Sequence, residues 1–375
     1  MRPYSEEELN ALFTRFIGEF GLKGEYVKYV CINSGNINDT YVIRTEVDGR
    51  LKNYLAQRIN TNAFPEPEKI ADNVVKVTEF IRQKLIEQHS YDVKRKALHY
   101  FRKANGAFYA IDNDSYWRVV SYINDSVTHD IADPDILYHT GAAFGEFQKL
   151  LSDFPLERLY DTIKDFHNTK KRYEALKAAA AEDKCGRLSS VKEEYDYLLS
   201  MEKEAFVICD LYESGAIPER VTHNDTKCNN VMFDALTGEH LAVIDLDTVM
   251  PGLVAYDFGD AVRFAANPAG EDCDDVSKVH LDLDYYSAFA SGFLPYVLGT
   301  LNDAEIASLP DGVLSITLEL AARFLTDYLS GDVYFKCKKP MHNLIRTRAQ
   351  IALAKDICSK LGAMRDRISC ITSKI

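Results

Sequence analysis

This sequence of 375 residues lacks the marks of several protein classes. No apolar run approaches the roughly 18 residues of a membrane span, and the opening MRPYSEEE lacks the apolar core of a signal peptide. The eight cysteines form no C-x-x-C pair and no cluster with histidine, which argues against a zinc site or a disulfide framework. Acidic residues outnumber basic ones by 57 to 44, which disfavours nucleic acid or an anionic membrane as partner. We therefore expect a cytoplasmic protein.

The chain is also poor in linker-like sequence. No Pro-, Gly- or Ser-rich segment divides it, although 375 residues with 46% hydrophobic residues suit two lobes better than one. We predict one lobe over residues 1–122 and a second over residues 123–375, joined by a hinge.

The first lobe is predicted to hold two helices and an antiparallel sheet. Ser5 and Glu8 form a capping-box pattern ahead of helically spaced apolar residues. Trp117, the only tryptophan, is interpreted as a packing residue rather than as a platform for adenine. We expect a helix over residues 67–88 and a five-stranded antiparallel sheet, whose strands come from six strand-like segments: 25–32, 40–47, 52–59, 97–103, 108–111 and 116–123.

The second lobe is predicted to be mostly helical. Amphipathic patterns cover segments 135–152, 168–181, 189–212, 284–292, 304–329 and 341–361. Beyond about Gly362 the hydrophobic pattern does not predict a particular secondary structure.

One polar stretch between Arg220 and Asp247 carries the chemistry. It contains a His-x-Asp-x-x-x-x-Asn array, His223 to Asn230, and a second acid, Asp245, at the end of a buried strand. Phosphoryl transfer from ATP needs one carboxylate for the attacking hydroxyl, and an amide and a second carboxylate for Mg²⁺. We assign the first role to Asp225 and the metal-binding role to Asn230 and Asp245.

The same stretch resembles the catalytic centre of the aminoglycoside phosphotransferase and choline kinase superfamily. Within it, THNDTKCNNVMFD and VIDLDTVMPGLVAYDFGD are similar to the N-acetylhexosamine 1-kinase branch. Further matches are INDTY, QRIN and ARFLTDYLSGDVYF, so the resemblance spans almost the whole chain. It implies an α/β (α+β) protein-kinase-like bilobal fold, ATP and Mg²⁺ as cofactors, and the anomeric hydroxyl of an N-acetylhexosamine as acceptor.

For the nucleotide, the resemblance implies the loop between the first two strands and a cation on the third. Kinases place a lysine there, whereas this chain has Gln57 and Arg58. We favour Arg58 as the phosphate-binding cation, with Glu68 as its possible partner, because Gln57 points to the opposite face. The other nucleotide-binding residues implied are Ser34, Gly35, Asn38 and Thr40.

Two residues of the motifs are interpreted as structural. Asp257 opens the letters of the protein-kinase metal motif, but it precedes a predicted helix over residues 261–266 instead of ending a strand. We therefore expect Asp257 to cap that helix or brace the catalytic loop. His223 is expected to pack and to bond the loop backbone.

For the acceptor, the resemblance implies Arg323, Tyr334, Asn36 and Asn224. Arg323 lies in an apolar helical stretch, where an unpaired charge would be costly to bury. It either forms a salt bridge with Glu319 or Asp327, or lines the acceptor site with Tyr334 as an aromatic wall.

Two other functions compete with a hexosamine kinase. A kinase of the same fold for choline, homoserine or an aminoglycoside would need carboxylate or aromatic groups around the acceptor. A nucleotide-binding protein without activity is disfavoured, because a binder has no need for Asp225.

Overall fold

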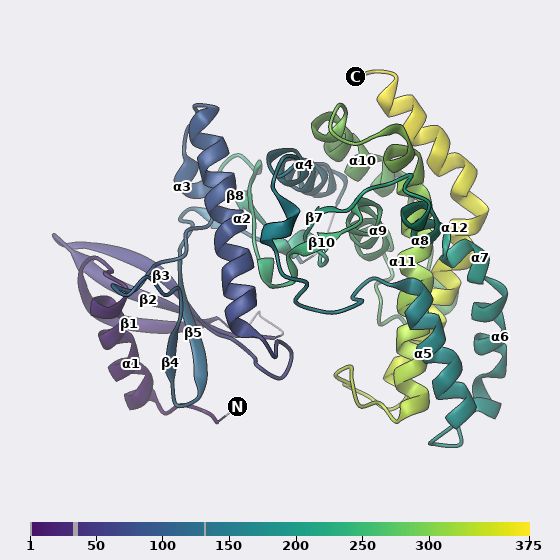
Figure 1. Cartoon of the computed structure of the whole chain (residues 1–375), viewed down its shortest axis with the longest axis horizontal. Helices are drawn as coiled ribbons and strands as arrows, with labels where there is room; N and C mark the ends of the chain where they lie inside the picture. Colours follow the sequence, from purple (N-terminus) through teal and green to yellow (C-terminus); the bar gives the residue numbers. More distant parts are fainter. Residues whose placement is uncertain (1, 33–36, 131–132) are drawn as a thin grey trace.

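The computed structural model describes residues 2–32, 37–130 and 133–375. An antiparallel sheet with its helices lies at one end of the molecule, and a larger helical region lies at the other (Figure 1). Helix α2 (Pro67–Glu87) runs between them. This is the bilobal, protein-kinase-like arrangement expected from the sequence, while the boundary after residue 122 stays a prediction.

The sheet of the first lobe has its strands in the order β1-β2-β3-β5-β4, and each neighbouring pair is antiparallel. The prediction of a strand over residues 97–103 is wrong. That segment touches β5 through one bridge, Tyr100 to Val120, because its apolar side chains turn into the core under α2. The strands are β1 (Glu25–Ile32), β2 (Asp39–Val47), β3 (Arg50–Arg58), β4 (Ala110–Asp112) and β5 (Ser115–Ser121).

Side-chain alternation gives this sheet two different faces. One face packs on α1 (Glu6–Glu19) and buries Ala56 of β3 and Trp117 of β5. Trp117 makes edge contacts with Tyr4 and Phe13, so it packs in this core. The opposite face is directed to α2 and the second lobe.

Short strands frame the catalytic stretch in the second lobe. β7 (Arg220–Thr222) pairs with β10 (Met250–Gly252). β8 (Val231–Asp234) lies between β6 (Ser126–Val127) and β9 (His240–Val243).

Helices build the rest of the second lobe, with two departures from the predicted pattern. Segment 189–212 is divided among short helices instead of forming one. The last helix continues past Gly362, because Met364 and Ile368 are buried against the core. None of the described helices is long and apolar enough to cross a membrane. The helices of this lobe are α4 (Pro134–Leu150), α5 (Thr169–Glu182), α6 (Lys192–Ser200), α7 (Glu202–Ala205), α8 (Val207–Glu213), α9 (Val254–Ala265), α10 (Leu283–Val297), α11 (Asp303–Ser330) and α12 (His342–Thr372), while the short helix α3 (Val93–Lys96) follows α2 in the first lobe.

The contact between α4 and α10 depends on glycine. A Cβ atom on Gly141 would lie 2.1 Å from the carbonyl oxygen of Phe289, and one on Gly292 would lie 1.9 Å from that of Tyr138. Because α4 also carries side chains that pack around His223, this close approach supports the catalytic loop.

Gly292→Ala should therefore lower the free energy of unfolding by roughly 1–3 kcal/mol through overpacking. Thermal or urea unfolding measures the effect. Gly362→Ala is the matched control, since the position is helical and has no atom within 4 Å of an added Cβ. It should be neutral or stabilise by roughly 0.5–1 kcal/mol, and an equal loss in both variants would contradict the packing argument.

Candidate active site

The catalytic stretch folds as a loop after β7 and a hairpin of β8 and β9. Asp225 lies in the loop, and Asp245 comes just after β9. The N–H of Ile244 donates to the carbonyl oxygen of Asn230 at 2.9 Å, which joins the two ends of the hairpin. The hairpin thus brings Asp225, Asn230 and Asp245 into one region.

Asp225 is fixed by two neighbours. Its Oδ1 forms an ion pair with Lys227 Nζ at 2.6 Å, and its Oδ2 accepts a hydrogen bond from Asn230 Nδ2 at 3.2 Å. Burial opposes the charge on Lys227, but the Asp225 carboxylate outweighs it and raises the pKa of the lysine. The Asp225 side chain keeps 27% of its surface exposed, so an incoming hydroxyl can reach it. Sequence reasoning missed Lys227, although its place two residues after the base was visible.

Asp245 has the most unusual electrostatic position. Its φ of 59° lies in the left-handed region. Desolvation by the surrounding protein, followed by the charges of Asp247 and Asp225, raises the pKa of Asp245 to about 6, although the residue itself is exposed to solvent. Asp225 and Asp247 each have a cationic partner, whereas Asp245 forms no ion pair within the described part of the chain. Such a carboxylate is suited to a bound cation.

Asn230 supplies a second oxygen to the same region. Its Nδ2 donates to the backbone and side-chain oxygens of Asp225, which leaves Oδ1 as a free acceptor. Within the described ranges, no group of three or more His, Cys, Asp and Glu residues could hold a metal ion. Asn230 and Asp245 fit the other common arrangement, in which Mg²⁺ takes one or two protein oxygens and the rest from phosphates and water.

Asp257 supports the catalytic loop by hydrogen bonds to its backbone. Its carboxylate accepts hydrogen bonds from the backbone N–H groups of His223 and Asn224, both at 2.8 Å. It lies within the first turn of α9, which begins before the predicted start at residue 261. His223 is fully buried, and its Nε2 lies 2.9 Å from the carbonyl oxygen of Ile244. Both residues have the placement of structural supports.

Asn224, for which an acceptor contact is predicted, has its side chain turned into the protein. Its φ is 64°, and this left-handed conformation turns the side chain inward. Nδ2 donates to the carbonyl oxygen of Thr248 at 2.9 Å, and the residue is buried. Its role is to hold the loop to the segment after Asp245.

Arg58 is also placed away from the catalytic acids. It is buried on the α1 face, where its guanidinium donates to Ser115 Oγ and to the carbonyl oxygen of Arg2. Glu68, its suggested partner, instead accepts from the hydroxyl of Tyr116 at 2.8 Å. The geometry therefore contradicts the prediction that Arg58 binds phosphate.

The face of the sheet directed to the catalytic acids carries a different arginine, Arg118 of β5. Its Nη1 lies 2.5 Å from Asp247 Oδ1, and its Nε donates to Gln57 Oε1 at 2.9 Å. Two predicted nucleotide residues share this face. Asn38 donates to Asp247 Oδ2 at 2.6 Å, and Thr40 Oγ1 accepts from Gln57 at 3.4 Å. The predicted residues Ser34, Gly35 and Asn36 lie outside the described residues.

Arg323 lies in a cluster formed by α11, the start of α5 and the turn after α11. Its guanidinium lies over the rings of Phe166 and Phe335, at 5.5 and 5.7 Å from their centroids. Its Nη1 is 3.8 Å from Glu319, a loose ion pair. Asp327, the other suggested partner, instead accepts from the backbone of residues 333–335 and folds the turn back onto α11.

The same cluster is rich in positive charge. Glu319 is shared by Arg323, Thr169 and His167, whose Nδ1 lies 3.0 Å away. Burial and then the charge of Arg323 lower the pKa of Arg172, whose Nε is buried without a hydrogen-bond partner in the described structure. His167 stacks on Tyr256, which precedes Asp257 in α9 and so links the cluster to the catalytic loop. We name these residues, Phe166, His167, Arg172, Glu319, Arg323 and Phe335, the acceptor-side cluster.

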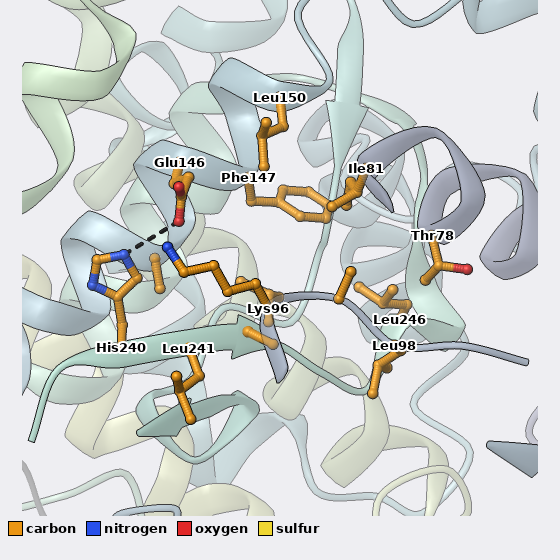
Figure 2. Close-up of a pocket in the computed structure, with 14 residues that line it drawn as sticks. Thr78, Ile81, Lys96, Leu98, Glu146, Phe147, Leu150, His240, Leu241 and Leu246 are labelled. Atoms are coloured by element: carbon orange, nitrogen blue, oxygen red, sulfur yellow. Dashed lines mark ion pairs between the residues drawn. The ribbon is translucent and has the colours of Figure 1, made fainter. Parts of the chain in front are cut away.

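A separate cavity lies behind the hairpin, among α2, α4 and β9 (Figure 2). Its apolar walls include Ile81 and Phe147, and an ion pair of 3.3 Å between Glu146 and His240 lies at one side. No predicted catalytic or binding residue lines it. We therefore place the active site on the loop side of the hairpin.

The sequence of this chain matches the model of a known protein family. The phosphotransferase enzyme family matches residues 29–289, more than half of the chain. The chain belongs to this family. It is thus a small-molecule phosphotransferase, and its resemblance to the wider superfamily is confirmed.

Solved structures share the fold of this phosphotransferase at low identity. A microcompartment-associated aminopropanol kinase is 16% identical with a TM-score of 0.61, and the match covers 94% of this chain and 98% of that one. An ethanolamine kinase from Plasmodium vivax is 15% identical with a TM-score of 0.56, covering 95% and 91%. A spectinomycin phosphotransferase in complex with ADP and spectinomycin is 10% identical with a TM-score of 0.56, covering 95% and 100%.

Asp225→Asn should keep the fold of the phosphotransferase and reduce turnover by roughly 10²–10⁴-fold, the usual contribution of a positioned acid or base. Steady-state kinetics and thermal unfolding check both parts. Asp257→Ala is the contrast, because loss of the buried brace should chiefly lower the melting temperature. Near-normal turnover in Asp225→Asn would remove that residue from the mechanism.

Asp245 should make the metal-free protein less stable as the pH rises. Its folded pKa of about 6 exceeds the ordinary value of 3.8, so the folded state holds the proton more tightly than the unfolded state. Stability from this group is present below pH 4 and is lost as the pH rises through 6. Asp245→Asn should therefore raise the melting temperature relative to wild type at pH 8 more than at pH 5. An equal difference at both pH values would show that the carboxyl titrates normally.

Proposed function

We propose that this phosphotransferase transfers the γ-phosphoryl group of ATP, with Mg²⁺, to the anomeric C1 hydroxyl of an N-acetylhexosamine. The proposal combines the motif resemblance with the charge of the acceptor-side cluster. Binding of ADP by the related spectinomycin phosphotransferase supports a nucleotide in the same place here.

In the proposed reaction, Asp225 accepts a hydrogen bond from the sugar hydroxyl and takes its proton as the oxygen attacks the γ-phosphorus, while the bond from that phosphorus to the bridging oxygen breaks and ADP leaves. An anomeric hydroxyl is more acidic than an ordinary alcohol, so orientation matters more than strong basicity. The ion pair with Lys227 fixes the direction of Asp225 Oδ1. Asn230 Oδ1 and Asp245 would hold Mg²⁺, which when bound offsets the negative charge of the phosphates.

The charge of the acceptor-side cluster is the observation that carries the choice of acceptor. Arg172 and Arg323 face one carboxylate, Glu319, which is already shared with His167 and Thr169. A cationic amino alcohol would meet the charge of both arginines, while Glu319, the carboxylate beside them, is already engaged with His167 and Thr169. A neutral sugar, by contrast, offers hydroxyl and amide oxygens that guanidinium groups can donate to.

The position of Tyr334 is compatible with a wall for the sugar ring. Its ring is 71% exposed and lies edge-on to Phe335, whose ring packs on Phe324 of α11. The backbone N–H groups of residues 333–335 are anchored on Asp327, so the turn has a defined place beside Arg323.

The competing function is a kinase for choline, homoserine, an aminoglycoside or a small amino alcohol. The fold is shared with proteins named aminopropanol kinase and ethanolamine kinase, so a kinase for an amino alcohol is the main alternative. Two nearby acids are nevertheless occupied, since Asp260 pairs with Arg263 and Glu319 with the acceptor-side cluster, while Asp245, which has no ion pair in the described structure, is assigned to Mg²⁺.

A screen of ATP consumption separates these functions. The purified chain with Mg·ATP is given N-acetylglucosamine, N-acetylgalactosamine, choline, ethanolamine, homoserine and an aminoglycoside in turn. Higher kcat/KM with an N-acetylhexosamine supports the proposal, and a product assay by NMR would place the phosphate on C1. Preference for a cationic acceptor would overturn the proposed acceptor while leaving the kinase activity in place.

Arg323→Ala should raise the KM for the acceptor by roughly tenfold or more, the size of one lost hydrogen bond from a charged donor, and leave the KM for ATP unchanged. Arg187→Ala is a matched control, because that arginine also lies over an aromatic ring and pairs with Asp332 of the same turn. It should lower the melting temperature without a selective effect on the acceptor. Equal loss of stability and of both substrates in Arg323→Ala would show a purely structural arginine.

A further inference from the structure

The residue of β3 that faces the second lobe carries no charge. Kinases place a lysine on this strand against the nucleotide phosphates. In this chain the corresponding face of β3 presents Gln57, and Arg58 points the opposite way into the α1 core. The cation on this face is Arg118, directly across from Gln57 in the antiparallel pairing of β3 with β5.

Arg118 connects the two lobes through Asp247. Both side chains are 3% exposed, and their closest atoms, Nη1 and Oδ1, are 2.5 Å apart. Asn38, from the segment before β2, donates to the other oxygen of Asp247 at 2.6 Å and accepts from the backbone N–H of Asn60 at 2.9 Å. Two residues of the first lobe therefore hold one acid of the second.

Asp247 is two residues after Asp245, in the same tight segment. Asp245 takes a left-handed conformation, and the chain then forms a single turn through residues 246–248. A shift of Asp247 would change the backbone on which Asp245 depends. The pair Arg118–Asp247 is buried, so removing one partner would leave the other charge without compensation.

We propose that Arg118 is a positioning residue for the nucleotide–metal site: by holding Asp247, it fixes the segment of Asp245 and the approach of the two lobes. In this chain the positive charge on this face of the sheet comes from Arg118 of β5, whereas kinases supply it from β3. The ligand class is a nucleoside di- or triphosphate with a divalent cation, and to that extent the inference rests on the proposed function. Gln57 orients the guanidinium through Nε.

The test compares two buried arginines of neighbouring strands, Arg118→Met and Arg58→Met. ADP binding is measured by calorimetry with Mg²⁺ and with EDTA, together with melting temperature. Arg118→Met should weaken Mg·ADP by about tenfold or more, as expected when the outer support of a metal ligand is lost, and change metal-free ADP by less than about twofold. Arg58→Met should lower the melting temperature and leave the ratio of the two affinities unchanged.

Asp247→Asn keeps the shape of the partner and decides the matter if Arg118→Met does not fold. It should lose the same Mg²⁺-dependent part of the affinity, and Arg118→Lys should recover part of it. An unchanged affinity ratio in Asp247→Asn, or an equal change in Arg58→Met, would overturn the positioning role. Absence of ADP binding by the wild-type chain would be a different result, because it would refute the nucleotide and with it the proposed function.

Discussion

The site depends first on one buried carboxylate, Asp257. Burial raises its pKa, while hydrogen bonds from the N–H groups of His223 and Asn224 favour the ionised form. Gln148 of α4 donates to the same acid at 3.3 Å. Loop backbone is seldom buried, because its polar groups then need partners. Here Asp257 supplies them, so the loop that carries Asp225 can lie against α4 and α9 rather than in water.

Around Asp257, the charged side chains form two groups, one acidic and one basic. Asp225, Asp245 and Asp247 concentrate negative charge beside the catalytic loop, where desolvation and then the charges of Asp247 and Asp225 raise the pKa of Asp245. Arg172 and Arg323 concentrate positive charge around Glu319. The first group is suited to a metal ion, and the second is the one to which the proposed function assigns a neutral acceptor. An acceptor hydroxyl that reaches Asp225 would lie between the two, beside Lys227.

The parts that sequence reasoning found are those with local or periodic signals. The acids of the catalytic stretch and the hairpin that joins them follow from residue type and from a strand pattern. Arg58 was misplaced because a strand alternates between faces, and an assignment one residue off puts a side chain into the opposite core. The inward direction of the Asn224 side chain could not be predicted, because the neighbouring residues give no signal of its positive φ. No helix was predicted for the end of α12, because the residues that Met364 and Ile368 pack against lie far away in sequence.

The acceptor is harder to infer from such signals, for a physical reason. Its proposed contacts come from segments far apart in the chain: the start of α5, the middle of α11 and the turn around Tyr334. These segments lie outside the strands and the loop that carry Asp225, Asn230 and Asp245, although His167 connects them to α9 through Tyr256. The same fold occurs in proteins named for amino alcohols and for aminoglycosides. In this chain, the two guanidinium groups beside Glu319 are the feature on which the proposed choice of acceptor rests.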